Sequence, residues 1–227
     1  VYSGMLKALD RSVGRILDTL EKNNLTDNTL IVLTSDNGGA NYIHLSDINK
    51  PYRGWKLTHF EGGLHVPFMA KWPNKIKPGI EFNAPIHAND ILPTFAAAAG
   101  AELPDDRIID GVNLLPFLQN HNSEMPHETL YWLQGRLQTV LHENWKLITD
   151  HRTGKDWLFN VESDPYERIN LASEMTLKVE ELKRLLNDHK KVQPPPLYDN
   201  TMSVPILIDK HNGYAFQDGD EFTYWDN

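Results

Sequence analysis

The 227-residue chain contains no cysteine. That absence excludes a disulfide framework, a thiolate zinc site and a cysteine nucleophile within these residues. The chain also lacks long apolar runs. The densest one, Phe95 to Ala99, is far shorter than the roughly 20 residues that a membrane-spanning helix needs. The sequence therefore predicts no membrane span.

Basic residues are in the minority, because 22 Lys and Arg stand against 31 Asp and Glu and leave a net charge of −9. An acidic protein gains little from releasing counterions on a phosphate backbone, so nucleic acid is not an expected partner. Aromatic residues make up 10% of the chain and no internal repeat is visible, which excludes collagen-like, coiled-coil and disordered classes. The composition indicates a soluble globular protein that is long enough to bury a core without disulfides.

The beginning of the chain has no initiator methionine and no basic-then-apolar signal segment. Its first residues already follow a helical pattern. We therefore expect a fragment, with any targeting signal lying upstream.

The first half of the chain alternates helical and strand-like segments. The expected elements are helices over residues 2–22, 91–99 and 114–118 and strands over residues 29–34 and 66–72. The strand at Thr29–Thr34 is apolar on both faces, which is typical of a central parallel strand covered by helices. Asn89 or Asp90 is expected to cap the second helix. This alternation is typical of a doubly wound α/β sheet.

The second half has a different texture. Short strand-like runs cover residues 128–134, 137–142, 145–149 and 157–160, with a hairpin turn expected at Glu143-Asn144. Ser173 is expected to cap a helix that carries Leu177 to Leu186. An antiparallel sheet with one helix makes a small α+β unit. The expected division is 1–122 for the α/β core, 123–193 for the α+β subdomain and 194–227 for a tail led by three prolines.

The segment Ser35–Gly39 follows the first strand, at the end where open α/β sheets bind their ligands. Asp36 and Asn37 offer a carboxylate and an amide oxygen, the kinds of ligand that Ca²⁺ and Mg²⁺ prefer. These residues are also those that turns prefer, so an ordinary turn is the alternative. Two ligands do not complete a cation shell, and further carboxylates would have to come from elsewhere.

Three further side chains are candidates for chemistry. Lys56 would act as a point charge on an anionic substrate, with a solvated surface lysine as the alternative. His59 would donate a proton, since imidazole titrates near neutrality, and His44 would line a pocket. A structural or exposed position is the alternative for both histidines. Glu61 is expected to be structural, with its carboxylate holding loop amides.

In their order along the chain, the segments resemble the C-terminal half of a formylglycine-dependent sulfatase of the alkaline phosphatase superfamily. The resemblance covers about residues 1 to 190, and each motif is weak alone but strong in this order. The motifs are Asp27-Asn28-Thr29, Ser35-Asp36-Asn37-Gly38-Gly39, Pro51-Tyr52-Arg53-Gly54-Trp55-Lys56, Glu61-Gly62-Gly63, Val66-Pro67, Trp72-Pro73, Asp90-Ile91-Leu92-Pro93-Thr94, Asp110-Gly111-Val112-Asn113-Leu114, Trp145-Lys146-Leu147-Ile148, Leu158-Phe159-Asn160, Asp164-Pro165-Tyr166-Glu167-Arg168 and Asn170-Leu171-Ala172.

The resemblance implies the C-terminal part of an alkaline-phosphatase-like doubly wound sheet, followed by a small α+β subdomain. It implies that Asp36 and Asn37 bind a divalent cation, Ca²⁺ or Mg²⁺, and that Lys56 contacts the sulfate group. The family's nucleophile is a formylglycine made in a Cys/Ser-x-Pro-x-Arg motif. This chain has neither that motif nor the family's early aspartate pair, and His65 stands where the family often has arginine.

We therefore expect the nucleophile in a missing N-terminal half, which would be this chain's partner, and no sulfate-ester hydrolysis by the chain alone. The implied substrate is a sulfate ester, with a sulfated sugar as one candidate, and the implied location is periplasmic or secreted. Residues 40–52 and the tail after Pro196 are the expected specificity elements. A phosphodiesterase or phosphonate hydrolase of the same superfamily and a non-catalytic binding module are the alternatives, because fold does not fix function.

Overall fold

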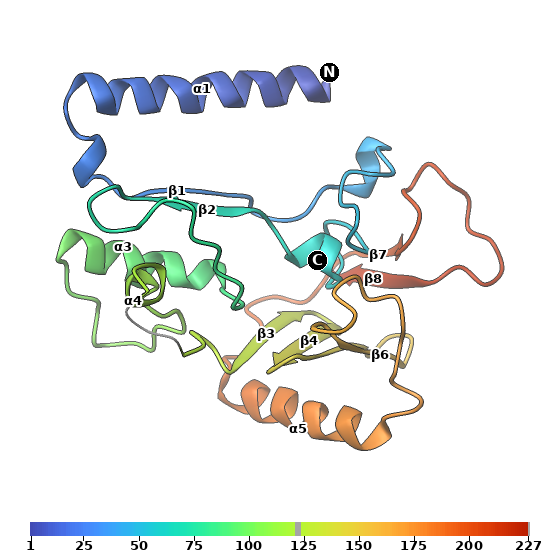
Figure 1. Ribbon diagram of the computed structural model, residues 1–227. Coiled ribbons are helices and arrows are strands. Elements are labelled where there is room, and N and C mark those ends of the chain that lie inside the picture. The colour runs from blue at the N-terminus through green and yellow to red at the C-terminus, as the bar shows by residue number, and fades with distance from the viewer. Residues whose placement is uncertain (121–123, 227) are drawn as a thin grey trace. The chain divides into compact units, whose positions relative to one another are not determined.

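The computed structural model describes residues 1–120 and 124–226 (Figure 1). The chain packs as two units, the first made of Val1–Thr34 with Phe68–His127 and the second of Ser35–Pro67 with Glu128–Asn227. Residues 35–67 thus pack with the C-terminal sheet, although the sequence groups them with the α/β core. The expected division at 122 and 193 stays a prediction, and its first boundary lies outside the described residues.

The first unit contains the helices and strands that the sequence predicts. Its helices are α1 (Tyr2–Lys22), α3 (Ile91–Ala99) and α4 (Leu115–Leu118), its strands are β1 (Ile31–Thr34) and β2 (Phe68–Lys71), and its 3-10 turns are η1 (Thr26–Asn28) and η3 (Ala88–Asp90). Gly100 ends α3 in the left-handed conformation that the sequence predicts for a helix stop. None of the helices in the described part of the chain combines the length and the apolarity that crossing a membrane requires.

The sequence predicts β1 as a central parallel strand, but its pairing with the described residues is antiparallel. β1 pairs antiparallel with β2, with Ile31 opposite Lys71 and Thr34 opposite Phe68, and the two form a two-stranded sheet. Leu33 remains 41% exposed, so the apolar run is not covered on both faces here. A continuous apolar run indicates that a strand can be buried, but it does not determine the direction of the neighbouring strand.

Asp90 connects the start of α3 to the segment before α4. It is fully buried, accepts hydrogen bonds from the backbone amides of His87 (2.7 Å) and Val112 (2.8 Å), and lies 2.8 Å from Nε2 of His127. Burial alone would raise the pKa of Asp90, but these hydrogen bonds lower it. Asp90 is the N-cap residue of α3, as expected, yet its carboxylate serves these other partners rather than the amides of α3.

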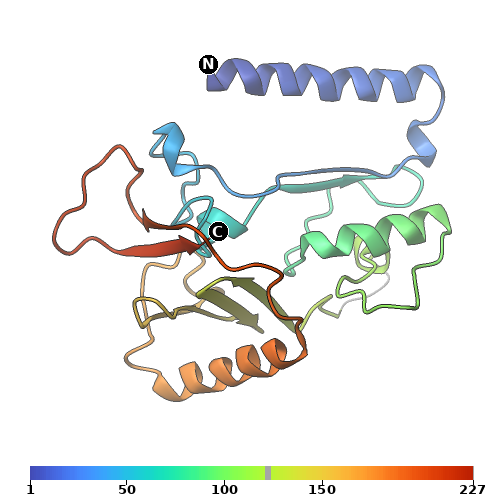
Figure 2. The ribbon, with the colours of Figure 1, turned by 180° about the vertical axis from the view of Figure 1, so that it is seen from behind.

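The second unit is built on a four-stranded antiparallel sheet in the order β3-β4-β5-β6. Its strands are β3 (Thr129–Gln134), β4 (Leu137–His142), β5 (Trp145–Asp150) and β6 (Lys155–Asn160), and α5 (Thr176–Val192) lies along one face of the sheet (Figures 1 and 2). This confirms the predicted strands and the turn at Glu143-Asn144. The predicted cap is wrong, because α5 begins at Thr176 with Met175 as its N-cap residue, and Ser173 lies outside the helix.

The remaining elements of this unit are short. They are η2 (Asn41–Ile43), α2 (Glu61–Leu64) and the antiparallel hairpin of β7 (Ser203–Leu207) and β8 (Phe222–Asp226). The sequence leaves the tail unassigned, so this hairpin is a finding of the structure. The two strands are short and are separated by residues 208–221, so no two-residue turn marks their pairing.

Both faces of the four-stranded sheet are covered, by different parts of the chain. The side chains of Val140, Leu147 and Leu158 pack against Val179, Leu182 and Leu186 of α5. On the other side Leu137, Ile148, Trp157 and Phe159 pack with Phe60 and Ile208. Successive strand residues point to opposite faces, which is how Leu147 and Ile148 enter different clusters. The tail, through Ile208, is therefore part of the core.

A buried ion cluster lies at the centre of the second unit. The ammonium of Lys146, whose side chain is 1% exposed, lies 2.6 Å from Glu61 Oε1 and 2.8 Å from Glu167 Oε1. Burial acts to lower the pKa of Lys146, but the two carboxylates outweigh it and raise that pKa. Burial acts to raise the pKa of Glu61, yet Lys146 and His65 lower it to about 2, while burial and the charge of Glu61 raise the pKa of Glu167.

Replacing Lys146 by methionine is expected to destabilise the protein by about 3–5 kcal/mol, because two buried carboxylates lose their cation. The measurement is urea unfolding at pH 7. Without the cation, the folded-state pKa of both carboxyls lies above the unfolded value of about 4.3. The destabilisation should therefore shrink as the pH falls below about 4, where both carboxyls of the variant become neutral in either state.

The matched control is Lys191→Met on α5, whose side chain is 74% exposed and pairs with Asp188 at 2.7 Å. Such a surface pair contributes about 0–1 kcal/mol, so this variant should unfold almost as the parent does. Equal unfolding free energies for Lys146→Met and the parent at pH 7 would contradict the assigned role of the cluster.

Candidate functional site

Three loops of the second unit meet through backbone hydrogen bonds and form what we call the glycine junction: Ser35–Gly39, Asn49–Lys56 and Phe60–Gly63. Gly38 N donates to Gly63 O at 3.0 Å, Lys56 N donates to Gly39 O at 3.0 Å and Gly62 N donates to Arg53 O at 2.6 Å. The chain enters the junction directly after β1 ends at Thr34. Residues 17 positions apart, Gly39 and Lys56, are thereby brought into contact.

Glycine is required at the junction because the backbones approach too closely for a side chain. A Cβ atom at Gly38 would lie 1.8 Å from the carbonyl oxygen of Gly62, and one at Gly62 would lie 2.4 Å from the carbonyl oxygen of Gly54. Both neighbours are backbone atoms that cannot rotate away. Gly38 and Gly62 thus allow the close approach of one loop to another.

Asn49 fixes the junction from within. Its Oδ1 accepts from Gly39 N at 2.7 Å, and its Nδ2 donates to Gly39 O at 2.9 Å and to Gly54 O at 3.0 Å. Sequence reasoning missed this residue. The reason is that the stretch Asn49-Lys50-Pro51 is typical of an ordinary turn, in which asparagine is common.

Asp36 and Asn37 lie at the edge of the junction. Asp36 is exposed and its Oδ1 accepts from Asn37 N at 3.0 Å, while Asn37 Nδ2 donates to Gly38 O at 2.8 Å. The Asn37 amide therefore has its nitrogen engaged, which orients its oxygen away from Gly38 O. The Asp36 carboxylate and this oxygen are both hard ligands of the type that suits Ca²⁺ or Mg²⁺.

The donor set fits a divalent cation in kind but not in number. Ca²⁺ takes about six to eight oxygen ligands and Mg²⁺ about six, whereas this loop supplies ligands from Asp36 and Asn37 alone. Within residues 1–120 and 124–226, no cluster of three or more His, Cys, Asp or Glu side chains is arranged to hold a metal ion. These two residues can therefore form only part of a cation shell.

Lys56 is half-buried, and its backbone amide is bound to Gly39 of the Asp36 loop. In the described part of the chain its ammonium group forms no ion pair, unlike those of Lys146 and Lys155. A partly desolvated ammonium group without a carboxylate partner is suited to an anionic ligand. The structure thus joins the backbone of Lys56 to the loop that contains Asp36 and Asn37.

His59 lies in the core rather than in a pocket. Its side chain is 5% exposed and its Nδ1 lies 2.9 Å from Oγ1 of Thr139 on β4. Burial, with a further contribution from the positive charge of Lys146, lowers the pKa of His59 to about 3. At neutral pH this imidazole is uncharged and carries no proton that it could readily donate as an acid.

His44 is exposed at the end of η2, in the left-handed conformation with φ of 58°. Its Nε2 lies 2.9 Å from Oδ1 of Asn212, and its ring stacks on His211 with centroids 5.1 Å apart. His44 therefore lies at the surface beside the tail, and its hydrogen-bond partner Asn212 is 168 positions away along the chain.

Arg53 attaches the tail to the junction, and sequence reasoning assigned it no role. Its Nε and Nη2 donate to the Asp209 carboxylate at 2.8 and 2.7 Å, and Nη2 also donates to Glu221. Burial acts to raise the pKa of Glu221, because it favours the neutral acid, but hydrogen bonds from Lys155 and Arg53 prevail and bring the pKa to about 2. The tail is therefore held by charge-assisted hydrogen bonds on a side chain that is 9% exposed.

Glu61 is structural, as expected, but through different partners. Its carboxylate binds Lys146 and Nδ1 of His65 (2.8 Å) rather than loop amides. His65 in turn stacks on Tyr52 with ring centroids 4.4 Å apart. The histidine that stands in place of the family's usual arginine thus links Glu61 to the segment that carries Lys56.

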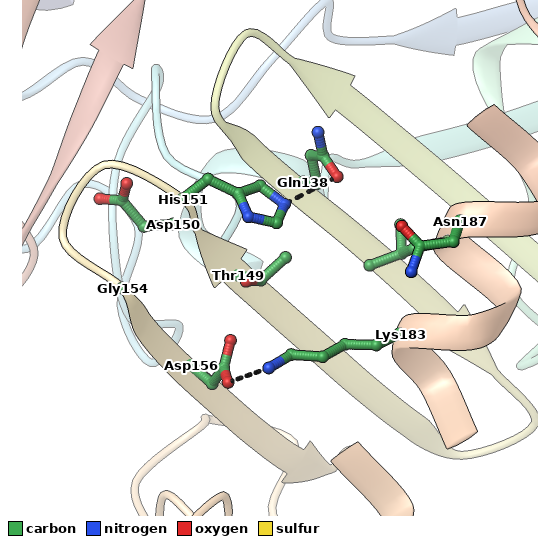
Figure 3. Close-up of a pocket in the computed structure, with 9 residues that line it drawn as sticks. Gln138, Thr149, Asp150, His151, Gly154, Asp156, Lys183 and Asn187 are labelled. Atoms are coloured by element: carbon green, nitrogen blue, oxygen red, sulfur yellow. Dashed lines mark hydrogen bonds and ion pairs between the residues drawn. The ribbon is translucent and has the colours of Figure 1, made fainter. Parts of the chain in front are cut away.

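A separate pocket of about 210 Å³ lies between the sheet and α5 (Figure 3). Its polar side chains largely satisfy one another, since His151 pairs with Gln138 at 3.0 Å and Lys183 pairs with Asp156 at 2.7 Å. None of the candidate residues at the glycine junction lines this pocket. We assign it no part in the site.

Comparison with known proteins identifies the family. The family model described as Sulfatase matches residues 1–101, and the one described as N-sulphoglucosamine sulphohydrolase, C-terminal, matches residues 54–192. Steryl-sulfatase of Rattus norvegicus is 38% identical over 171 residues, which cover 72% of this chain and 29% of the rat protein. The Ulvan-active sulfatase of Formosa agariphila is 30% identical over 228 aligned positions, which cover 83% of this chain and 42% of that protein.

Among solved structures, Ps i-CgsB in complex with k-i-k-neocarrahexaose superposes with a TM-score of 0.76 at 32% identity, covering 87% of this chain and 44% of that chain. The chain thus spans less than half the length of each of these relatives. The matches confirm the alkaline-phosphatase-like fold class and the resemblance that the ordered motifs predict. This chain belongs to the sulfatase family.

Proposed function

We propose that the chain is the C-terminal part of a sulfatase and supplies one anion contact and two cation ligands to an active site that hydrolyses sulfate esters. The observation that carries this proposal is the glycine junction. It joins the backbone of Lys56, whose ammonium group forms no ion pair with the described residues, to the loop of Asp36 and Asn37 by a hydrogen bond of 3.0 Å. An ammonium group and hard oxygen ligands on one rigid support are suited to a tetrahedral anion bound beside a cation.

Lys56 would bind the sulfate oxygens and stabilise the negative charge that develops on them during hydrolysis. Because its backbone is fixed at Gly39, the ammonium group needs little reorganisation when the substrate arrives. Asp36 and Asn37 would hold Ca²⁺ or Mg²⁺ together with ligands from outside these residues, and such a cation would neutralise charge on the sulfate. The formylglycine expected for the family would likewise lie outside this chain.

The proton that the leaving oxygen requires would not come from His59. That imidazole is buried against Thr139 and neutral at the pH of most hydrolases, since its pKa is about 3. His44 is exposed, as a pocket residue would be. The proposed leaving-group acid is a histidine from outside this chain, as the family resemblance implies.

A sulfated sugar is the proposed substrate class. Support comes from similar structures described with such ligands, which include k-i-k-neocarrahexaose and D-Glucosamine-2-N, 6-O-disulfate. The second of these neighbours is 27% identical with a TM-score of 0.58. Phosphate or phosphonate ester hydrolysis is the alternative, and turnover of 4-nitrophenyl phosphate rather than 4-nitrophenyl sulfate by the complete protein would favour it.

Lys56→Ala, made in the protein expressed from its complete coding sequence, should lower kcat/KM for 4-nitrophenyl sulfate by about 10²–10³. Loss of one preformed contact to a developing oxyanion typically has this effect. Lys191→Ala, at an exposed position of α5, should leave the rate unchanged. If Lys56→Ala retains the parent kcat/KM while the parent is active, Lys56 does not contact the sulfate.

Asp36→Asn should weaken cation binding, because one charged ligand is lost. In the same complete protein we expect Ca²⁺ to raise the parent Tm after treatment with EDTA, and the variant to need at least about tenfold more Ca²⁺ for the same shift. Asp105→Asn, in an exposed loop, is the matched control. A parent Tm that does not respond to Ca²⁺ or Mg²⁺ would remove the cation from the proposal.

The 227 residues alone should not turn over 4-nitrophenyl sulfate, because they contain neither a cysteine nor a Ser-x-Pro-x-Arg motif from which formylglycine could form. The assay is release of 4-nitrophenol by the purified chain, with and without Ca²⁺. Turnover that co-purifies with the chain and disappears in Lys56→Ala would show instead that the chain carries a complete active site.

A further inference from the structure

An exposed group of rings joins the tail to the loop after the Asp36 segment. His44 stacks on His211 with centroids 5.1 Å apart and an interplanar angle of 25°, and His211 lies against Tyr214 with centroids 4.5 Å apart. His44 is exposed and Tyr214 is 54% exposed. We call His44, His211 and Tyr214 the ring platform.

Hydrogen bonds fix the orientation of both imidazoles. Nε2 of His44 lies 2.9 Å from Oδ1 of Asn212, and since a carbonyl oxygen can only accept, Nε2 of His44 carries the hydrogen. Nδ1 of His211 accepts from Gly213 N at 3.1 Å, and Tyr214 N donates to His211 O at 3.1 Å. The platform is thus a built feature, with its residues held by a tight turn at 211–214.

The platform is anchored to the segment that carries Lys56. Asp209, two residues before His211, is bound by Arg53, three residues before Lys56. Ile208 is fully buried, and Lys210 binds Asp220 at 2.6 Å across the base of the tail loop. Figures 1 and 2 show η2 and the β7–β8 loop side by side in both views. The tail loop is therefore fixed relative to the proposed sulfate contact.

We propose that the ring platform binds a sugar ring of the sulfated substrate and so determines specificity for oligosaccharides, an inference that rests on the proposed sulfatase function. The exposed ring of Tyr214 would stack its face against the C–H groups of one face of a pyranose ring, and the imidazoles, which stack on each other beside it, would border that sugar. The side-chain amide of Asn212, whose oxygen is engaged by His44, would offer its Nδ2 hydrogens to a sugar hydroxyl.

The composition of the platform favours a sugar over a steroid or a simple aryl group. Flat hydrocarbon ligands are bound in concave sites lined mainly by apolar side chains. Here two of the three rings are imidazoles, an amide lies at their edge, and the surface is exposed. A ligand that presents both C–H groups and hydroxyls matches this mixture.

The test uses Tyr214→Ala and His211→Ala in the protein expressed from its complete coding sequence. Two sulfate esters are compared, k-i-k-neocarrahexaose and 4-nitrophenyl sulfate, the second of which has no sugar to reach the platform. We expect each variant to raise KM for the hexasaccharide about tenfold with kcat nearly unchanged, as loss of one stacking contact does. Both kinetic constants for 4-nitrophenyl sulfate should stay at the parent values.

Tyr198→Ala is the matched control, because this tail tyrosine is 75% exposed and is not part of the platform. It should change neither substrate's KM, and thermal unfolding should show that all three variants fold. Unchanged hexasaccharide KM in Tyr214→Ala and His211→Ala, with the parent active on it, would overturn the platform proposal. Equal KM increases for both substrates would overturn it as well, since the contact would then not be to the sugar.

Failure of the proposed function gives a different result. If the parent hydrolyses neither sulfate ester, the sulfatase proposal fails, and binding of the hexasaccharide measured by calorimetry then tests the platform alone. Binding that Tyr214→Ala weakens about tenfold would support the platform as a sugar site. Absence of binding by the parent would overturn it.

Discussion

The second unit depends on the ion pairs that the buried ammonium group of Lys146 forms with Glu61 and Glu167. The ammonium group neutralises Glu167, whose other oxygen, Oε2, accepts from the backbone amide of Glu61 at 2.7 Å. That amide begins α2, the turn that contains Gly62 and Gly63. Gly63 then accepts from Gly38 N, beside Asp36 and Asn37. A single charge on β5 is thus connected, hydrogen bond by hydrogen bond, to the loop that carries the proposed cation ligands.

This arrangement explains why motifs that look catalytic in sequence are partly structural. Glu61 and Glu167 belong to segments with glycine, proline and charged residues, which are typical of functional loops. The structure uses their carboxylates to hold Lys146 and the turn at Gly62. Leaving one of these carboxylates without its cation in a buried place would be costly, so the three groups act as a unit. The residues left for a ligand are those that the cluster does not engage, above all Lys56.

Arg53 performs a similar task for the tail. Its guanidinium group is buried over the ring of Phe60 and binds Asp209 and Glu221, which lie on either side of the tail loop. A planar guanidinium can hold two carboxylates at once, which a lysine ammonium does less specifically. The loop between these two acids carries His211 and Tyr214. The tail is therefore a fixed wall of the second unit rather than a flexible extension.

Much of the local structure was predictable because it depends on spacing along the chain. Apolar residues at helical intervals predicted α1 from Tyr2 to Lys22, and alternating runs predicted β3 to β6. The ordered motifs also predict Asp36, Asn37 and Lys56 as site residues, and their roles stay a prediction. What failed depends on partners far along the chain. The direction of the strand next to β1, the hairpin of the tail and the burial of His59 against Thr139 leave no local pattern.

His59 shows most clearly why residue type alone does not locate a site. It lies three residues after Lys56, in a segment rich in glycine and aromatic residues, and its imidazole could serve as an acid. Yet Lys56 stays half-buried and its ammonium group forms no ion pair with the residues that the structure describes, while His59 packs against Thr139 and its pKa falls to about 3. Burial decides between them, because desolvation penalises the charged form of a histidine that no carboxylate accompanies. The cluster around Lys146 adds a positive charge nearby and makes protonation still less favourable. The same interaction that holds the glycine junction therefore also removes His59 from acid catalysis, and the roles proposed for Lys56, Asp36 and Asn37 need no proton from it.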